Sequence, residues 1–414
     1  MNEDIAAYVG VDWASATHYA YALDAQGAKL GHRSFQHSGD GLAELADWIQ
    51  RTTGAEPGRI AIGIEVPHGP VVESLMDSGF LVHALNPKQL DRFRDRFTMA
   101  GAKDDRPDAF VLADALRTDS RFYRFLEPVH PTIIQLREWS RMMEDLSAER
   151  NRLANRFRHQ LWRYFPQMLE LAEDWSQQWI LDLWDLIPTP ARARAVRTST
   201  IARRLKESRV KRWTADTLLN HLRSTPISVA SGVTEACVAH CELILGRLRL
   251  VMQQMKLAMK ELERLCSAVA ELPSATGIAP HADPKILRSM PGIGTIVLAA
   301  LLSEGHDAIV RRDAQALRGL SGVVPVTRRS GKQIVVVMRQ SCPHRLRTAV
   351  YHWARVAVLH DFQTRNRYAA LRKRGHSHAR ALRSIGSRLI GVACAMLRTG
   401  ELFDNGRPPQ SAAA

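Results

Sequence analysis

The sequence lacks several features that would place it in a common class. Its 414 residues include only five cysteines, and the closest pair is Cys237 and Cys241. One pair cannot complete a zinc site, so we expect small buried thiols in a reducing compartment. No run of about 18 apolar residues occurs, which excludes a membrane-spanning helix. The first residues also lack the basic and apolar regions of a signal peptide.

Acidic residues are in deficit. The 57 Lys and Arg residues exceed the 42 Asp and Glu residues, which gives a formal net charge of +15 at pH 7. Such an excess indicates a polyanionic partner, most often nucleic acid. We therefore expect a cytoplasmic protein that binds nucleic acid and has no membrane partner.

The first part of the chain alternates between strand and helix patterns. Three strands come first, followed by a helix, a strand, a short helix, a strand and a longer helix. Nearly continuous apolar strands that alternate with helices favour an α/β sheet with helices on both faces. The expected strands span residues 8–12, 18–23, 29–35, 59–65 and 81–85, and the last helix opens at Asp105.

Four acids stand at the ends of these elements. Asp12 closes the first strand, and Glu65 closes the fourth. Asp105 and Asp108 lie three residues apart at the start of the last helix, and the apolar spacing that follows puts both on its buried side. The alternative is an N-cap at Asp105 and a first-turn acid at Asp108. Acids that point toward a core must be neutralised, hydrogen-bonded or bound to a cation, so a cation site is one possibility here.

Beyond residue 125 the pattern becomes helical. Apolar residues repeat at spacings of three and four over residues 136–157 and again over residues 241–266, which is a heptad pattern. An antiparallel hairpin, a dimer zipper and an ordinary helical core all fit it. Between them lies a basic insert, which favours either a solvated face or a phosphate-binding patch. Its cations are Arg192, Arg194, Arg197, Arg203, Arg204, Lys206, Arg209, Lys211 and Arg212.

A glycine turn opens the last third of the chain. The segment 286–295, which contains Gly292 and Gly294, resembles the hairpin of helix-hairpin-helix modules. In such modules backbone N–H groups contact DNA phosphate. Two basic amphipathic helices follow further on, over residues 345–358 and 372–397.

A serine stands between cations in the segment Arg328-Arg329-Ser330-Gly331-Lys332. This setting suits attack on a phosphodiester, because cations stabilise the charge that develops on phosphorus. The alternative is a serine that only contacts phosphate or closes a turn. Ser321 is the next candidate for a nucleophile.

The order of these motifs resembles one family. The first domain is similar to the RuvC branch of the ribonuclease-H superfamily, with one acid ending the first strand, one ending the fourth and two on the last helix. Over roughly residues 5 to 400 the chain resembles the IS110 family of bacterial insertion-sequence transposases. The motifs that carry this resemblance are Gly10-Val11-Asp12, Gly63-Ile64-Glu65, Asn86-Pro87, Lys103-Asp104-Asp105-Arg106-Pro107-Asp108-Ala109, Met290-Pro291-Gly292-Ile293-Gly294, Gly322-Val323-Val324-Pro325 and Ser330-Gly331.

The resemblance implies a recombinase that cuts and joins donor and target DNA. It implies that Ser330 forms a phosphoserine link to DNA and that a structured guide RNA, called a bridge RNA, pairs with both DNAs. It also implies a homodimer or homotetramer in the bacterial cytoplasm, associated with the nucleoid. The basic insert is longer than is typical of the family, so its role does not carry over. The implied catalytic acids and Mg²⁺ ligands are Asp12, Glu65, Asp105 and Asp108. The expected nucleic-acid contacts are Gly292, Gly294, Arg328, Arg329 and Lys332.

Four segments are expected. They are a RuvC-like domain (1–125), a helical coiled-coil region with the basic insert (126–275), a serine transposase domain that is mostly helical (276–405) and a disordered tail (406–414).

Three other functions compete with a recombinase. A metal-dependent junction-resolving nuclease would cut by hydrolysis, without a protein–DNA adduct. A nucleoid-type binding protein explains the charge but not the four acids. An actin-like sugar kinase shares the opening strand, but the sequence has no glycine-rich phosphate loop.

Overall fold

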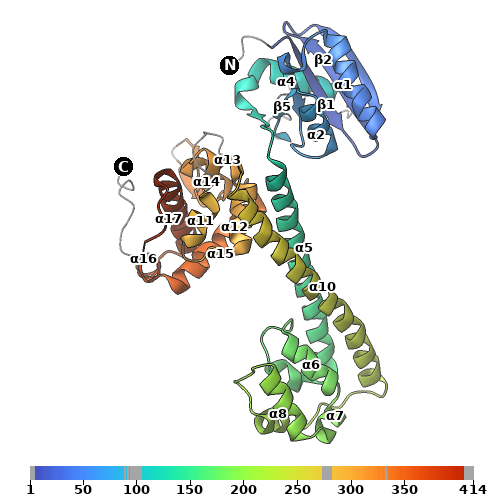
Figure 1. Ribbon diagram of the computed structural model, residues 1–414, viewed down its shortest axis with the longest axis vertical. Helices are drawn as coiled ribbons and strands as arrows, with labels where there is room; N and C mark the ends of the chain where they lie inside the picture. The colour runs from blue at the N-terminus through green and yellow to red at the C-terminus, as the bar shows by residue number, and fades with distance from the viewer. Residues whose placement is uncertain are drawn as a thin grey trace. The chain divides into compact units, whose positions relative to one another are not determined.

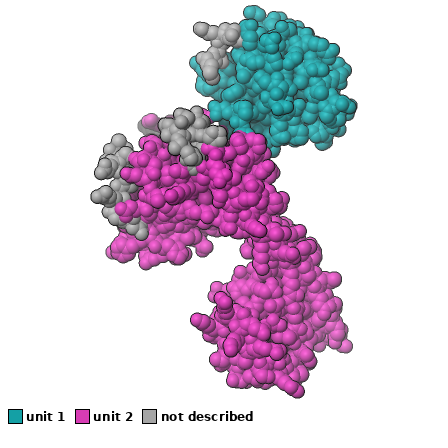
Figure 2. Space-filling model, in the orientation of Figure 1, with its two compact units in different colours: residues 1–129 teal, residues 130–414 magenta. Residues whose placement is uncertain are grey.

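A computed structural model describes residues 5–87, 90, 93, 105–272, 282–331 and 333–404, with the backbone alone at 105–107. The chain divides into two compact units, residues 1–129 and 130–414 (Figure 2). The first is mixed α/β and the second is mostly helical. The expected boundary near residue 275 and the expected tail lie outside the described residues and stay predictions.

Six strands form the sheet of the first unit, in the order β3-β2-β1-β4-β5-β6. The three central strands, β1, β4 and β5, are parallel, whereas β2, β3 and β6 run antiparallel to their neighbours. The five expected strands are confirmed to within one or two residues, and the short β6 was not expected. The strands are β1 (Ala7–Trp13), β2 (Thr17–Asp24), β3 (Lys29–Gln36), β4 (Ile60–Ile64), β5 (Leu81–Ala84) and β6 (Arg124–Phe125).

Helices cover both faces of this sheet, as the sequence predicted (Figure 1). Helices α1 (Gly39–Thr53) and α2 (Pro70–Asp77) pack on the face that holds Val9 and Ile62. Helix α4 (Asp105–Asp119) packs on the opposite face, because successive side chains of a strand point to opposite sides.

Two long helices, α5 (Pro131–Tyr164) and α10 (Val233–Val269), form the centre of the second unit (Figure 1). They run antiparallel, since Arg156 contacts His240 at 3.3 Å while Glu149, two turns earlier, pairs with Arg247 at 3.5 Å. Their heptad residues share one core within the chain. That core includes Leu153, Phe157, Leu245 and Leu248.

The basic insert folds into a cluster of short helices at the end of the α5–α10 pair where α5 finishes and α10 begins (Figure 1). Trp184 donates a hydrogen bond of 3.0 Å to the Tyr164 hydroxyl, which donates in turn to the Pro188 carbonyl at 2.8 Å. We call residues 165–232 the insert cluster. It contains a 3₁₀ turn (Pro166–Glu170), α6 (Gln178–Leu186), α7 (Pro190–Ala195), α8 (Thr198–Glu207) and α9 (Ala215–Leu222).

The remaining helices lie in the last third of the chain. There Trp353 is wholly buried, and its indole N–H donates to the Pro291 carbonyl at 3.1 Å. An exposed β-hairpin, β7 (Val326–Ser330) and β8 (Gln333–Val337), emerges from this helical region. The helices are α11 (Asp283–Ser289), α12 (Thr295–Glu304), α13 (His306–Val310), α14 (Ala314–Leu320), α15 (His344–His360), α16 (Phe362–Lys373) and α17 (His378–Thr399).

All five cysteines are free thiols, and only Cys342 is not buried. Burial raises the pKa of Cys241 to about 12 and that of Cys266 to about 11. This agrees with thiols that serve as small hydrophobic side chains. Within the described ranges, no helix is long and apolar enough to cross a membrane.

Candidate active site

Two glycines lie side by side in the parallel strands β1 and β4, where Gly10 pairs with Gly63. Helix α4 runs directly over both. A Cβ atom on Gly10 would lie 1.9 Å from the carbonyl oxygen of Ala109, and one on Gly63 would lie 3.0 Å from that of Leu112. The lack of side chains at both positions lets the helix backbone approach the sheet closely.

This close packing fixes the direction of α4. Leu116, near the end of the helix, packs with Tyr8 early in β1. Ala109, about two turns earlier in the helix, lies over Gly10, further along β1. The helix therefore runs antiparallel to β1, and its first turn is directed toward the carboxyl end of the strand, where Asp12 stands.

Three of the expected acids are directed to this edge of the sheet. Val11 pairs with Ile64, so Asp12 and Glu65 come next on adjacent parallel strands. Strand alternation puts both on the same face as the two glycines, which is the face that α4 covers. Asp108 lies in the first turn of α4. All three acids are partly exposed.

A divalent cation is the group that these carboxylates would hold. Among the side chains that the structure describes, no set of three or more His, Cys, Asp or Glu is grouped to hold a metal ion. The side chain of Asp105 lies outside that set, although its backbone begins α4. The donor chemistry fits, because carboxylates from three elements reach one edge of the sheet, and Mg²⁺ prefers such oxygen ligands.

Strand register adds a neighbour that the sequence did not reveal. Tyr19 pairs with Asp12 across β1 and β2, so it lies on the same face. Its hydroxyl is hydrogen-bonded to Nδ1 of His32, and that imidazole stacks on Tyr21. Alternation within the expected second strand could identify its two faces, but not which residue stands opposite Asp12.

Ser330 lies at the tip of the β7–β8 hairpin, where it pairs with Gln333. Gly331 follows in the left-handed region with a φ of 55°, as a two-residue hairpin turn requires. The Ser330 side chain is exposed, so it is accessible to a large substrate. Lys332 lies outside the described residues.

The two arginines that precede the serine lie on opposite faces of β7. Side chains alternate along β7, so Arg328 shares the face of Ser330 while Arg329 lies on the opposite face. Both arginines are exposed. Arg329 is the cation next to Ser330 in the sequence. Within the strand, however, it is the Arg328 side chain that lies on the same face as Ser330.

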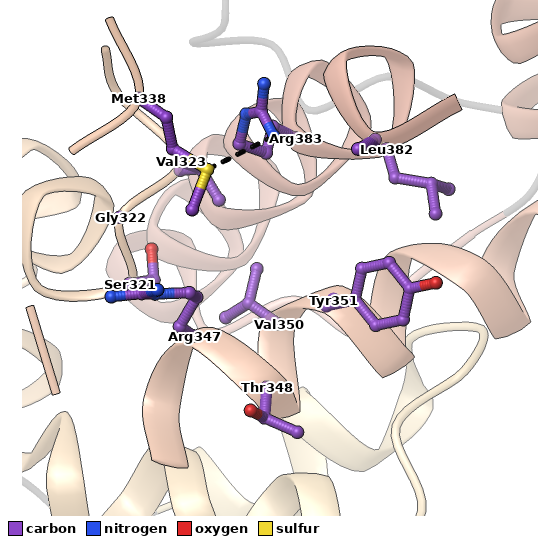
Figure 3. Close-up of a pocket in the computed structure, with 11 residues that line it drawn as sticks. Ser321, Gly322, Val323, Met338, Arg347, Thr348, Val350, Tyr351, Leu382 and Arg383 are labelled. Atoms are coloured by element: carbon purple, nitrogen blue, oxygen red, sulfur yellow. Dashed lines mark hydrogen bonds between the residues drawn. The ribbon is translucent and has the colours of Figure 1, made fainter. Parts of the chain in front are cut away.

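A cavity of about 270 Å³ lies at the base of this hairpin (Figure 3). It is lined by the segment 321–323, by Met338 at the end of the hairpin and by residues of α15 and α17, and Arg383 donates to the Met338 sulfur at 3.5 Å. Ser321 is wholly buried, and its hydroxyl donates to the Arg318 carbonyl at 3.2 Å. It is therefore a much poorer candidate nucleophile than Ser330.

The glycine turn at residues 291–294 joins α11 to α12. Gly292 has a φ of 88°, and a Cβ atom there would lie 2.8 Å from the carbonyl oxygen of Trp353. Gly294 precedes α12 as its exposed N-cap residue. The two glycines therefore differ, because Gly292 is required for packing against α15 while Gly294 is open to a partner.

The segment that carries the acids and the segment that carries Ser330 each match a family model. A model of DEDD-type IS110 proteins, described as "Transposase", matches residues 9–166, and the model "Transposase IS116/IS110/IS902 family" matches residues 284–369. The chain belongs to the IS110 family of transposases. The first match contains all four acids, and the second contains Gly292, Gly294 and Ser330. The expected family is thereby confirmed.

Relatives extend the IS110 match over nearly the whole chain. "Mini-circle putative transposase for IS117" of Streptomyces coelicolor is 29% identical over 417 residues, which cover 98% of this chain and 97% of the relative. "Insertion element IS110 uncharacterized 43.6 kDa protein" of the same species is 25% identical over 98% of this chain and 97% of its own length. "Putative transposase y4uE" of Sinorhizobium fredii is 58% identical over 216 residues, which are 52% of this chain and 60% of that relative.

Proposed function

We propose that this chain is the recombinase of an insertion sequence and that it joins donor DNA to target DNA. The observation that carries the proposal is the pair Asp12 and Glu65, which follow paired positions on adjacent parallel strands beneath the first turn of α4. The likeness to transposases indicates DNA as the substrate, since both family models are named for transposases.

The four acids Asp12, Glu65, Asp105 and Asp108 are proposed to hold Mg²⁺. A bound divalent ion would neutralise the charge on the attacked phosphate and favour the deprotonated form of a nearby hydroxyl. The acids themselves supply the negative charge that retains such an ion. If the four carboxylates converge as proposed, a cation between them would offset the repulsion between like charges.

Ser330 is proposed to be the nucleophile. Its oxygen bonds to phosphorus, the bond from phosphorus to one deoxyribose oxygen breaks, and that oxygen leaves as a hydroxyl after taking a proton. Arg328 lies on the same strand face and can stabilise the charged transition state. The recipient DNA hydroxyl then attacks the phosphoserine, which restores the serine and joins the strands.

The serine still needs a proton acceptor. Arg328, Arg329 and Lys332 keep their protons at neutral pH, so none of them can act as the base. We infer that the acidic site of the first unit supplies this function when nucleic acid brings it to Ser330. The two parts can come from one chain or from two subunits.

The assembly is proposed to be a homodimer or homotetramer guided by a bridge RNA. The heptad residues that suggested a zipper are used within the chain, but three exposed leucines lie seven residues apart on the outer side of α10. Their side chains make an apolar stripe suited to coiled-coil pairing between two copies. They are Leu243, Leu250 and Leu257, with exposed fractions of 72%, 55% and 61%. The turn at Gly294 is proposed to act as a helix-hairpin-helix contact to DNA phosphate.

A strand-transfer assay tests the function. Protein expressed beside its flanking element DNA is purified with its RNA and incubated with Mg²⁺ and with labelled donor and target DNA. Joined product is expected with native protein, and none is expected with the Asp105→Asn, Asp108→Asn double variant. Folding should persist in that variant, since it removes like charges. Joined product at the native level from the double variant would contradict the proposal.

The alternative is a metal-dependent junction-resolving nuclease, which the acidic site alone could support. It predicts cut DNA with free ends, no joined product and no dependence on Ser330. The same assay separates the two functions. A discrete RNA is expected to co-purify, whereas random fragments of many lengths would favour a nucleoid-type protein.

A further inference from the structure

The basic segment of the insert cluster is more than a charged surface. Residues 190–213 contain nine Lys and Arg residues and a single acid, Glu207. Within the described residues, Glu207 pairs with Arg204 at 3.4 Å, and the other eight cations all have exposed side chains. A helical cluster with this excess presents a strong positive field to solvent.

A hollow of about 480 Å³ lies beside this segment. Arg209, Lys211 and Arg212 contribute three cations to its lining, and Glu173 contributes the one acid. This volume is within the range of about 300–1,000 Å³ that small-ligand sites occupy in proteins. The charge of its lining residues favours an anion.

Two tryptophans also line the hollow. Trp179 is fixed by a hydrogen bond of 2.7 Å from its indole N–H to the side chain of Gln177. Trp213 donates to the Leu171 carbonyl at 3.3 Å, and the Arg212 guanidinium lies 5.8 Å from the centre of its ring. Both are partly exposed, so each presents aromatic surface to the hollow.

The backbone at the end of α8 brings a cation to this hollow. Arg209 adopts a φ of 53°, in the left-handed region that glycine usually occupies at a helix end. The Val210 N–H reaches back to the Leu205 carbonyl at 2.9 Å, which holds the turn in place. A bulky cation therefore stands where the helix end alone would favour glycine.

We propose that this hollow binds an unpaired nucleotide of a single-stranded nucleic acid. A base would stack on the tryptophan surface, and the adjoining phosphates would contact Arg209, Lys211 and Arg212. Aromatic platforms beside a basic track are how proteins bind single strands without reading a duplex groove. This inference goes beyond the strand-exchange function and does not depend on it, because the family models match neither residue 209 nor its neighbours.

The test measures binding and does not involve strand transfer. Full-length protein, stripped of nucleic acid at high salt, is titrated into a fluorescent 15-nucleotide single strand, supplied as DNA in one arm and RNA in the other, and into a duplex of the same length. Tighter binding of a single strand than of the duplex is expected. The tighter of the two arms identifies the strand as DNA or RNA.

Charge reversal locates the site. The Lys211→Glu, Arg212→Glu variant should weaken single-strand binding by about tenfold or more and flatten its salt dependence, since each lost phosphate contact lowers the slope by about 0.7. The matched control is Lys256→Glu, Lys260→Glu, which makes the same charge change at two exposed positions of α10. It should have a much smaller effect. Equal losses of affinity in both variants would show that binding depends on overall charge attraction and not on this site.

Two further measurements keep the proposal testable if a variant folds poorly. Trp179→Leu should lose about fivefold or more in affinity, whereas Trp179→Phe should retain most of it, because a base stacks on any aromatic face. In unmodified protein, a strand carrying 5-iodouracil should photocrosslink to a peptide that contains Trp179 or Trp213. Crosslinks confined to other parts of the chain, or equal affinity for the duplex, would overturn the proposal.

Discussion

At the scale of single residues, Gly10 and Gly63 decide where the acids stand. Each lies two positions before an acid, Asp12 within β1 and Glu65 just after β4, and both are covered by the backbone of α4. A side chain at Gly10 would push the helix away from the sheet, and the carboxylates of Asp12 and Asp108 would separate with it. The geometry of the acidic site therefore depends on residues that have no chemistry of their own.

Gly10→Ala is expected to destabilise the first unit by about 3 kcal/mol or more, because the added carbon overlaps the helix backbone. Strand transfer should be lost as well. Gly63→Ala should cost less, since its nearest contact is 3.0 Å rather than 1.9 Å. Gly58→Ala is the control, because nothing lies within 4 Å of its added Cβ. Denaturant unfolding measures each effect, and similar midpoints for all three variants would contradict the packing argument.

His18 makes the stability of the first unit depend on pH. It is wholly buried and hydrogen-bonded to His37 at 2.8 Å, and burial lowers its pKa from the usual 6.5. The unfolded chain therefore binds a proton more readily than the folded one. The stability contributed by neutral His18 is fully present above about pH 6.5 and is lost as the pH falls below that value.

The thermal unfolding midpoint should accordingly be lower at pH 5 than at pH 7.5. His18→Asn should make this difference smaller. His68→Gln serves as a control at an exposed position. Scanning calorimetry at several pH values measures the difference. An unchanged pH profile in the His18→Asn variant would show that this imidazole is not a source of the dependence.

At the scale of elements, the sequence could predict where helices and strands lie, but not which segments pack against one another. Apolar runs located the five strands, and the spacing of apolar residues on one face located the helix that opens at Asp105. The heptad pattern located the long helices α5 and α10. A heptad does not reveal whether its seam faces the same chain or another, and here Leu248 is buried within its own chain. Likewise, the sequence could not show that Arg328 rather than Arg329 lies on the face of Ser330, because that requires the strand.

Two sets of leucines on α10 should respond differently to substitution. Leu250→Asp with Leu257→Asp should dissociate the assembly into folded monomers, because both residues are exposed in the single chain. Leu248→Asp should instead unfold the α5–α10 pair, because it buries an unpaired charge. Light scattering measures the mass and circular dichroism the helix content. An intact oligomer in the exposed-leucine variant would exclude this stripe as the interface.

At the scale of the whole molecule, the proposed reaction draws on both units. In that proposal the acids of the first unit hold a metal and accept a proton. The second has an exposed serine beside an arginine, but the cations around it cannot serve as a base. A nucleic-acid substrate that engages both units would assemble the full site. In that proposal the protein is inactive toward DNA until such a substrate is bound.

Mixing two inactive variants examines whether the site is shared between subunits. Ser330→Ala and Asp105→Asn proteins are each expected to be inactive alone. If acids and serine come from different subunits, mixed oligomers contain some intact sites and strand transfer is partly restored. No recovery from a mixture whose subunits demonstrably exchange would place both parts of the site within one chain.

The covalent link between protein and DNA tests the central claim most directly. Native protein is incubated with its RNA, Mg²⁺ and DNA, the reaction is stopped with denaturant, and the peptide attached to nucleotide is identified by mass spectrometry. A nucleotide on the Ser330 oxygen is the predicted result, together with no adduct from Ser330→Ala protein that still binds DNA. An adduct of undiminished yield from the Ser330→Ala protein would contradict the account.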